Sequence, residues 1–230
     1  MGSQASLTTE PLPTVSTIAA LAQADSSMAL TSKITPFLWF PHPLALTAAE
    51  FYVSLFNSSP RPHTSKSAIV SKSTYTKSTT QELETHKDTP RHPPAGSVLV
   101  VQFSLCGQDF LALNGPYLPD QPQNSLFPFN EAISFSIECE TQEEIDYYWD
   151  GLTKDGGKAV DCGWCKDKFG MAWQVVPRRL GELMDPEGEG AEACGVVREM
   201  VAGAMMKMKR MEIQPLEDAA KEARNKCNER

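Results

Sequence analysis

The sequence predicts an α+β fold built from two copies of one strand–helix–strand–strand–strand unit. Three observations carry this prediction. Apolar and polar residues alternate in several short segments, a Thr-x-x-Glu pattern begins two amphipathic segments, and the same order of segments occurs twice. Alternation is typical of half-buried strands, and Thr-x-x-Glu is the capping box that satisfies free N–H groups at a helix start. The chain is therefore predicted to contain an internal repeat.

The first copy opens with the apolar segment 34–40 (ITPFLWF), which predicts a strand. Thr47 and Glu50 then form a capping box, so a helix is expected to begin there and to run through segment 47–56. The residues expected on its inner side are Phe51, Leu55 and Phe56.

The first copy continues with segment 67–75 (SAIVSKSTY), which can form a strand. Segment 96–114 predicts two further strands joined by a turn at 106–109. The residues that alternate along the first of these two strands are Leu99, Val101, Phe103 and Leu105.

The second copy opens with segment 132–140 (AISFSIECE), whose strict alternation predicts a strand. Thr141 and Glu144 repeat the capping box at the start of a helix that should stop at Asp155-Gly156-Gly157. Its predicted inner residues are Ile145, Tyr148, Trp149 and Leu152. Segments 158–166 and 171–177 follow as further strands, separated by the sequence DKFG.

The composition of the chain separates a leader, a folded domain with an insertion, and a C-terminal segment. Residues 1–32 are rich in Ser, Thr and Ala and are expected to form a disordered leader; their first letters, MGSQAS, leave open whether Gly2 is myristoylated. The folded domain is expected over residues 33–180, with a mobile Pro/Ser/Thr/Lys insertion at about 57–96. Residues 181–230 predict a C-terminal helical segment.

Within that C-terminal segment, apolar residues recur at helical spacing in a Met-rich stretch, residues 191–210. These residues are Val197, Val201, Ala204, Met205 and Met208. Docking on its own domain or on a sister protomer is the expected role, and a calmodulin-type target is the alternative. The last residues resemble a charged, frayed helical end.

Charge and hydropathy limit the classes of partner. The 230 residues carry a net charge of -8, which argues against nucleic acid, and no apolar run is long enough to cross a membrane. Six cysteines at irregular spacings predict no disulfide framework, as in a soluble cytoplasmic protein. Three of the four histidines lie in the insertion, so a histidine-based catalytic triad is not expected. Small molecules or proteins are the expected partners.

The strings ITPFLWF, FLALNGP, AISFSIECETQEEIDYYWDGL and CGWCKDKFGMAWQVVP resemble the PhnB-like branch of the vicinal oxygen chelate superfamily, which includes glyoxalase I, bleomycin-resistance proteins and extradiol dioxygenases. The resemblance covers about residues 33–180. It implies that the two βαβββ units form a curved mixed sheet around a pocket, with the helices outside. A homodimer is also expected.

The resemblance further implies a divalent metal held by His and Glu side chains on equivalent strands. Here those positions fall at about Ala132, Ala112 and Gln174, which cannot hold a hard cation, so we predict no metal and no cofactor. Some members of this branch bear the name of a 3-demethylubiquinone methyltransferase. The chain has no glycine-rich strand-to-helix turn followed by an acidic residue, the usual sign of a nucleotide-like cofactor site.

The sequence CGWC could be a redox pair, half a zinc site, or two unrelated cysteines. If DKFG is a hairpin turn, Trp164 faces Trp173 and Cys165 faces Ala172, and Cys162 and Cys165 point to opposite faces. With Gln174 pointing inward, the two tryptophans lie on the helix side. The residues predicted to line the pocket are Asn114, Ser134, Ser136, Cys165 and Gln174.

These residues predict a metal-free glyoxalase-fold protein that binds an unidentified small organic molecule, with the reaction and the catalytic residues unknown. One alternative is a noncatalytic sequestering or scaffold protein that uses the same pocket or its dimer surface. Another is a metal-dependent lyase or dioxygenase of the same superfamily.

Overall fold

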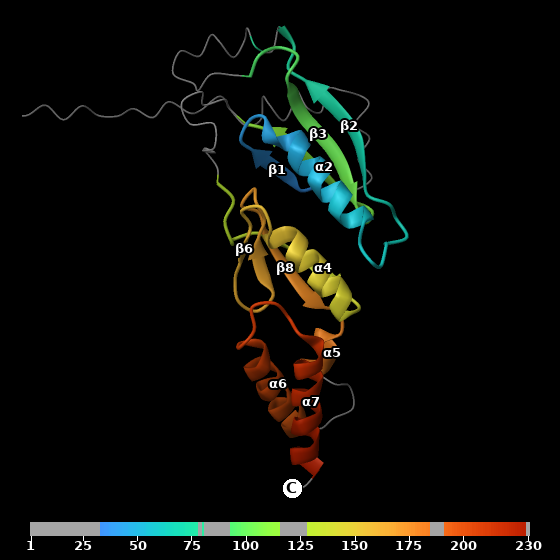
Figure 1. The fold of residues 1–230 in the computed structure, drawn as a ribbon, viewed down its shortest axis with the longest axis vertical. Helices are drawn as coiled ribbons and strands as arrows, with labels where there is room; N and C mark the ends of the chain where they lie inside the picture. The colour runs from blue at the N-terminus through green and yellow to red at the C-terminus, as the bar shows by residue number, and fades with distance from the viewer. Residues whose placement is uncertain (1–32, 78–79, 81–92, 116–127, 185–190, 229–230) are drawn as a thin grey trace, which may run out of the picture. The chain divides into compact units, whose positions relative to one another are not determined.

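The computed structural model describes residues 33–77, 80, 93–115, 128–184 and 191–228 (Figure 1). The chain divides into two compact units. Unit 1 comprises residues 1–56 and 64–127, and unit 2 comprises residues 57–63 and 128–230. Each unit contains one four-stranded mixed sheet with a helix across one face, so the predicted α+β fold with two βαβββ units is confirmed.

Unit 1 follows the predicted order of elements. They are β1 (Phe37–Phe40), α2 (Leu44–Asn57), β2 (Ala68–Thr74), β3 (Val98–Leu105) and β4 (Gln108–Asn114). The strand order in this sheet, sheet A, is β1-β4-β3-β2, with β1 parallel to β4 and the other neighbours antiparallel. Cys106 and Gly107 alone form the β3–β4 turn, with φ of 50° and 88°, so this turn is shorter than predicted.

Helix α2 begins at Leu44, and Thr47 lies inside it, so the predicted capping box was wrong. The Ala45 N–H instead donates to Oδ1 of Asn114 at 2.9 Å, and Nδ2 of Asn114 donates to the Val98 carbonyl at 2.8 Å. The cap is thus supplied by strand β4, 69 residues further along the chain. A local sequence pattern cannot show such a contact.

The buried side chains of α2 show which face of sheet A this helix covers. Tyr52, 1% exposed, stacks on Phe103 with ring centroids 6.2 Å apart, whereas the predicted inner residue Phe51 is only half-buried. Because alternate strand residues share a face, α2 covers the side that also holds Ala112 and Asn114. The opposite side holds Leu113.

Unit 2 repeats this arrangement. Its elements are β5 (Ser134–Cys139), α4 (Gln142–Thr153), β6 (Lys158–Ala159), β7 (Trp164–Lys166) and β8 (Ala172–Pro177). The strand order of sheet B is β5-β8-β7-β6, and β5 is parallel to β8. Since the first strand pairs with the fourth in both units, the predicted internal repeat is confirmed.

The capping box of α4 is confirmed. Oγ1 of Thr141 accepts from the Glu144 N–H at 3.3 Å, and Oε2 of Glu144 accepts from the Glu140 N–H at 2.8 Å. Two N–H groups at the helix start therefore have side-chain partners. The four predicted inner residues of this helix are all buried: Ile145, Tyr148, Trp149 and Leu152.

The C-terminal segment of unit 2 contains α5 (Leu180–Met184), α6 (Ala191–Met205) and α7 (Ile213–Asn228). Residues 217–228, predicted to be a frayed end, lie in the regular helix α7. Helices α6 and α7 lie side by side in Figure 1, and apolar residues of both are fully buried. These buried residues are Val197, Val201, Leu216, Ala220 and Ala223.

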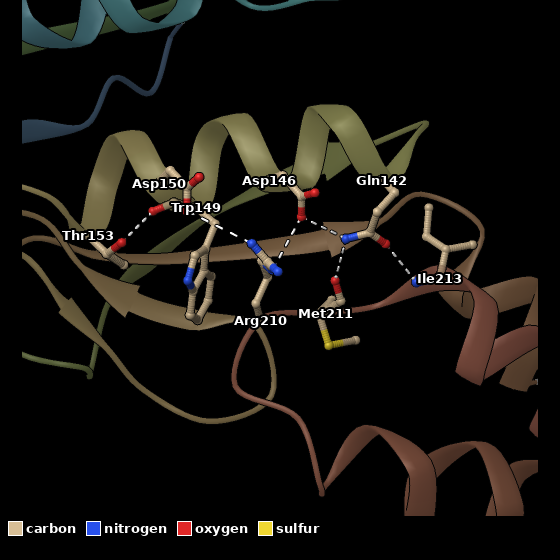
Figure 2. Close-up of polar contacts among 8 residues, drawn as sticks. All are labelled: Gln142, Asp146, Trp149, Asp150, Thr153, Arg210, Met211 and Ile213. Carbon is tan, nitrogen blue, oxygen red and sulfur yellow. Dashed lines mark hydrogen bonds and ion pairs between the residues drawn. The ribbon is translucent and has the colours of Figure 1, made fainter.

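Residues 206–212, which we call the strap, connect α6 to α7 and run along α4 (Figure 2). The Gln142 side chain donates to the Met211 carbonyl at 3.0 Å and accepts from the Ile213 N–H at 2.9 Å. Arg210 pairs with Asp146, with 3.2 Å between Nε and Oδ1. One side chain of α4 therefore binds the backbone at the end of the strap.

The strap also binds the turn before β7. The Cys162 and Gly163 N–H groups donate to the carbonyls of Met208 and Lys209, both at 2.8 Å. Cys162 and Gly163 have φ of 56° and 81°, which the turn requires. A side chain at Gly163 would collide with Met211, which is 0% exposed. The first half of CGWC is therefore a turn that fits against the strap.

Two predictions fall wholly or partly outside the described residues: the leader at residues 1–32, with Gly2, and part of the insertion, at residues 78–79 and 81–92. No helix in the described ranges has both the length and the apolar character needed to cross a membrane.

Candidate functional site

The β7–β8 hairpin has a different register from the predicted one. Trp164 pairs with Gln174, Cys165 with Trp173 and Lys166 with Ala172. Each residue of β7 therefore lies one position further along β8 than expected. The predicted cross-strand pair of Trp164 and Trp173 was wrong.

The side chain of Asp167 accounts for this register. Its Oδ1 accepts from the N–H groups of Phe169 at 2.8 Å and Met171 at 3.1 Å, and its Oδ2 accepts from Nε1 of Trp173 at 2.8 Å. Asp167 is 2% exposed, so these three donors have replaced water. The connection between the strands thus takes in Met171 and contains five residues rather than the four of DKFG.

A shift of one residue moves every side chain of a strand to the other face of the sheet. Cys165 therefore shares a face with Trp173, and Phe135 of the neighbouring strand packs on Trp173 with ring centroids 5.5 Å apart. This is the buried face of sheet B, where Ile137, Cys139 and Val175 are also shielded from solvent, and it is the face that α4 covers.

Cys165 is 1% exposed, and burial together with the nearby Asp167 carboxylate raises the pKa of its thiol to about 12. Cys165 and Gln174 do not share a face, so the prediction that both point into one pocket was wrong. Cys162 has different surroundings, since its thiol donates to the Met205 carbonyl at 3.7 Å.

Asn114 and Gln174 are in different units. Asn114 belongs to unit 1, where its side chain caps α2 and is 1% exposed. Ala112, predicted to match Gln174, lies on the same α2-covered face as Asn114. By face, the residue of β4 that corresponds to Gln174 is Leu113, which pairs with Trp39 and Val100.

The face of sheet B opposite α4, which we call the open face, brings the remaining predicted residues together. The register across the strands arranges it in rows. The first row is Ser134, Ala172, Lys166 and Lys158, and the second row is Ser136, Gln174 and Trp164. Glu138 lies beyond Ser136 on the same face.

The second row offers neutral polar groups. Nε2 of Gln174 donates to Oγ of Ser134 at 2.9 Å, which orients the amide. Among the described residues, Oε1 of Gln174, the Ser136 hydroxyl and Nε1–H of Trp164 have no hydrogen-bond partner. Gln174 and Trp164 are half-buried and Ser136 is exposed. These groups can therefore accept from or donate to a bound molecule.

The first row carries charge at one end. Nζ of Lys166 lies 2.6 Å from Oε1 of Glu131, and the hydrogen bond from Lys166 is the main cause that lowers the pKa of Glu131. Lys158 lies directly across from Lys166 on the neighbouring strand.

The sequence interpretation missed Trp164, Lys166 and Glu131. Asp167 was the sequence signal that could have placed Trp164 and Lys166 on this face. Asp at the start of a loop often binds backbone N–H groups two residues further on, and such a turn changes the register of the hairpin.

The donors on the open face do not fit the divalent metal that the resemblance implies. Gln174 contributes one amide oxygen, the two serines contribute neutral hydroxyls and Glu138 contributes a single carboxylate, whereas zinc prefers imidazole and thiolate and calcium prefers several carboxylates. The described residues contain no group of three or more His, Cys, Asp and Glu side chains that could hold a metal ion.

Two mixed βαβββ sheets, each with a helix across one face, are the architecture expected of a PhnB-like protein of the vicinal oxygen chelate type. Residues 32–176 match the model of the family described as 3-demethylubiquinone-9 3-methyltransferase, and the chain belongs to this PhnB-like family. None of the curated proteins matches the chain.

Solved structures of three bacterial proteins are similar to this chain. A PhnB protein from Bacillus cereus, which bears the same methyltransferase name, is 31% identical, with 63% of this chain and 99% of that one covered and a TM-score of 0.46. A Pseudomonas aeruginosa protein is 16% identical over 64% and 98% of the chains, with a TM-score of 0.40. A Staphylococcus aureus protein is 23% identical over 65% and 99%, with a TM-score of 0.24.

Proposed function

We propose that the open face of sheet B binds a small polar organic molecule through neutral hydrogen bonds and without a metal. The observation that carries this proposal is the second row, where Ser136, Gln174 and Trp164 lie side by side with unpaired polar atoms. A half-exposed row of donors and acceptors on a rigid sheet is typical of a binding surface rather than of a core.

Each side chain has a distinct part in this binding. The bond to Ser134 holds the Gln174 amide so that its oxygen faces away from Ser134 and can accept from an N–H or O–H of the ligand. The Ser136 hydroxyl can donate or accept. The indole of Trp164 supplies an apolar surface and one N–H donor. A ligand with a planar apolar part and neighbouring polar groups fits this set.

The second row has no titratable side chain, so it supports binding and does not by itself support proton transfer. Whether the ligand is turned over is left open, and a noncatalytic sequestering protein is the competing function. The methyl transfer in the family's name would need a donor site, and sheet B, with a single parallel strand pair, does not resemble a doubly wound nucleotide-binding sheet.

Native mass spectrometry of the purified protein tests the proposal. A small molecule should copurify with the wild-type chain and be lost from Gln174→Leu, because that change removes both the acceptor and the partner of Ser134. Gln214→Leu, on the exposed surface of α7, is the matched control and should keep the molecule. Equal retention by both variants, or a stoichiometric metal in elemental analysis, would contradict the proposal.

We further propose that the protein is a cytoplasmic homodimer, as its cysteine content and family resemblance suggest. Light scattering should give twice the mass of the chain, and cell fractionation should recover the protein with the cytoplasm. A chain-sized particle, or recovery with membranes, would contradict these two points respectively.

A further inference from the structure

The first row of the open face contains two lysines at neighbouring positions. Lys158 and Lys166 are directly opposite on antiparallel strands, and the alternation of side chains puts both on the face that holds Gln174. Like charges at directly opposite positions destabilise a sheet. In a chain with a net charge of -8, this pair is a local positive site that the fold does not require.

Within the described ranges, one carboxylate forms an ion pair with one of these two lysines. Glu131 lies 2.6 Å from Lys166, and no carboxylate in the described ranges pairs with Lys158. Glu131 precedes β5, and its side chain is 55% exposed. An exposed side chain outside the strands can leave Lys166 without disturbing the sheet.

We propose that the ligand of the open face is a small organic carboxylate, and that its carboxylate takes the place of Glu131 on Lys166, whose neighbour on the adjacent strand is Lys158. This inference rests on the proposed function, because it names the class of molecule that the same face binds. In the unliganded chain, Glu131 is the internal stand-in for the anionic end of the ligand.

The two rows determine how such a molecule would lie. Adjacent rows are about 7 Å apart along the strands, which is the length of an aromatic ring or a short acyl chain. A carboxylate at Lys166 therefore places the body of the ligand beside Trp164 and its polar groups near Gln174.

Glu138 favours one of the two directions in which the ligand could lie along the strands. It lies two rows beyond Ser134 on β5, about 13 Å along the strand from the lysine row. A carboxylate at that end would face a like charge, whereas at the lysine end it meets two opposite charges. The anionic end is thus directed to Lys166.

Benzoate and benzamide form a matched pair of probes, because they share the ring and differ in the charge of one group. We expect benzoate to bind the wild-type chain about fivefold more tightly than benzamide, as followed by protein NMR titration. Lys166→Met should abolish this preference by weakening benzoate binding to the level of benzamide. Glu131→Gln should raise benzoate affinity about threefold, because it removes the internal competitor.

The ion pair of Lys226 and Glu222 on α7, also 2.6 Å, supplies matched controls. Lys226→Met and Glu222→Gln should leave the affinities for both probes unchanged. If both probes bind equally and Gln174→Leu weakens both, the carboxylate inference is wrong and the proposed function stands. If neither probe binds at about 10 mM, the affinity expected of a fragment of this size, both proposals fail.

Discussion

The buried carboxylate of Asp167 determines which residues of the β7–β8 hairpin reach the open face. Because it binds two backbone N–H groups and the Trp173 indole, Met171 becomes part of the turn and the register moves by one residue. Trp164 then joins Gln174 on the open face, and Cys165 goes beneath α4. One side chain thus decides the composition of the candidate site.

Asp167→Ala should lower the free energy of unfolding by about 3 kcal/mol, because it leaves three buried donors without an acceptor. Chemical denaturation followed by circular dichroism measures this change. Asp218→Ala is the control, since Asp218 is exposed on α7 and should cost under about 0.5 kcal/mol. If Asp167→Ala lowers the free energy of unfolding no more than this control does, the turn does not depend on the carboxylate.

The Cys165 thiol should be almost inert in the folded chain. With a pKa of about 12, its thiolate fraction at pH 8 is about a thousandfold lower than that of an ordinary cysteine. Alkylation by iodoacetamide, followed by peptide mass spectrometry, should therefore be about a thousandfold slower at Cys165 in folded than in urea-denatured protein. Similar rates in the two states would contradict the burial of Cys165.

The raised pKa of Cys165 also has a consequence for stability. The folded state favours the protonated thiol, so the associated stability is complete below the unfolded-state pKa of about 8.5. It is lost as the pH rises from there toward 12. Cys165→Ala should remove this alkaline component of the pH dependence.

At the scale of elements, the two equivalent helices begin in different ways. Helix α4 is capped by Thr141 and Glu144 from its own first turn, whereas α2 is capped by Asn114 from strand β4. The first arrangement is local in sequence and was predicted correctly. The second depends on the folded sheet, so the capping box at Thr47 and Glu50 was misleading.

The strap depends on α4 through Gln142. Gln142→Leu removes the partners of the Met211 carbonyl and the Ile213 N–H, so we expect a loss of about 1 to 2 kcal/mol in the protection of the Ile213 amide. Amide hydrogen exchange by NMR measures it. Gln214→Leu is the control, and equal protection in the two variants would show that the strap binds without Gln142.

Arg210 should matter less than Gln142. Its pairs with Asp146 and Asp150 are partly exposed, at 3.2 and 4.0 Å, and such pairs contribute at most about 1 kcal/mol. In Figure 2 the Arg210 side chain extends toward the carboxylates of Asp146 and Asp150. The strap is therefore held chiefly by backbone hydrogen bonds and by the buried Met211.

At the scale of the whole molecule, α6, the strap and α7 lie beyond the matched family region, which ends at residue 176. The strap nevertheless binds the CGWC turn and α4, both within that region. The helices α6 and α7 are thus attached to unit 2 by contacts with its family core. The candidate site on the open face belongs to the same unit.

Truncation after residue 190 should destabilise unit 2 by about 4 kcal/mol. It uncovers the surface beneath Met211 and leaves the N–H groups of Cys162 and Gly163 without their carbonyl partners. Hydrogen exchange followed by mass spectrometry should show faster exchange in β7 and α4, with unit 1 peptides as the internal reference. Truncation after Arg224 removes only the last turn of α7 and should leave β7 unchanged.

The sequence by itself determined the parts of this protein that depend on near neighbours. The repeat, the alternation of β5 and the capped start of α4 were all predicted, because strand period and capping boxes act over two to four residues. Ser134, Ser136 and Gln174 were placed together correctly for the same reason, since they are on the two strands whose alternation was read correctly.

Only the tertiary structure decided the rest of the site. Register depends on the number of residues in a turn, and Asp167 sets that number through contacts reaching Trp173. The role of Asn114 depends on a helix 69 residues away. Such hydrogen bonds exist only once the sheet has formed. They give Asn114 a capping role in unit 1, put Cys165 on the face beneath α4 and bring Trp164 and Lys166 onto the open face.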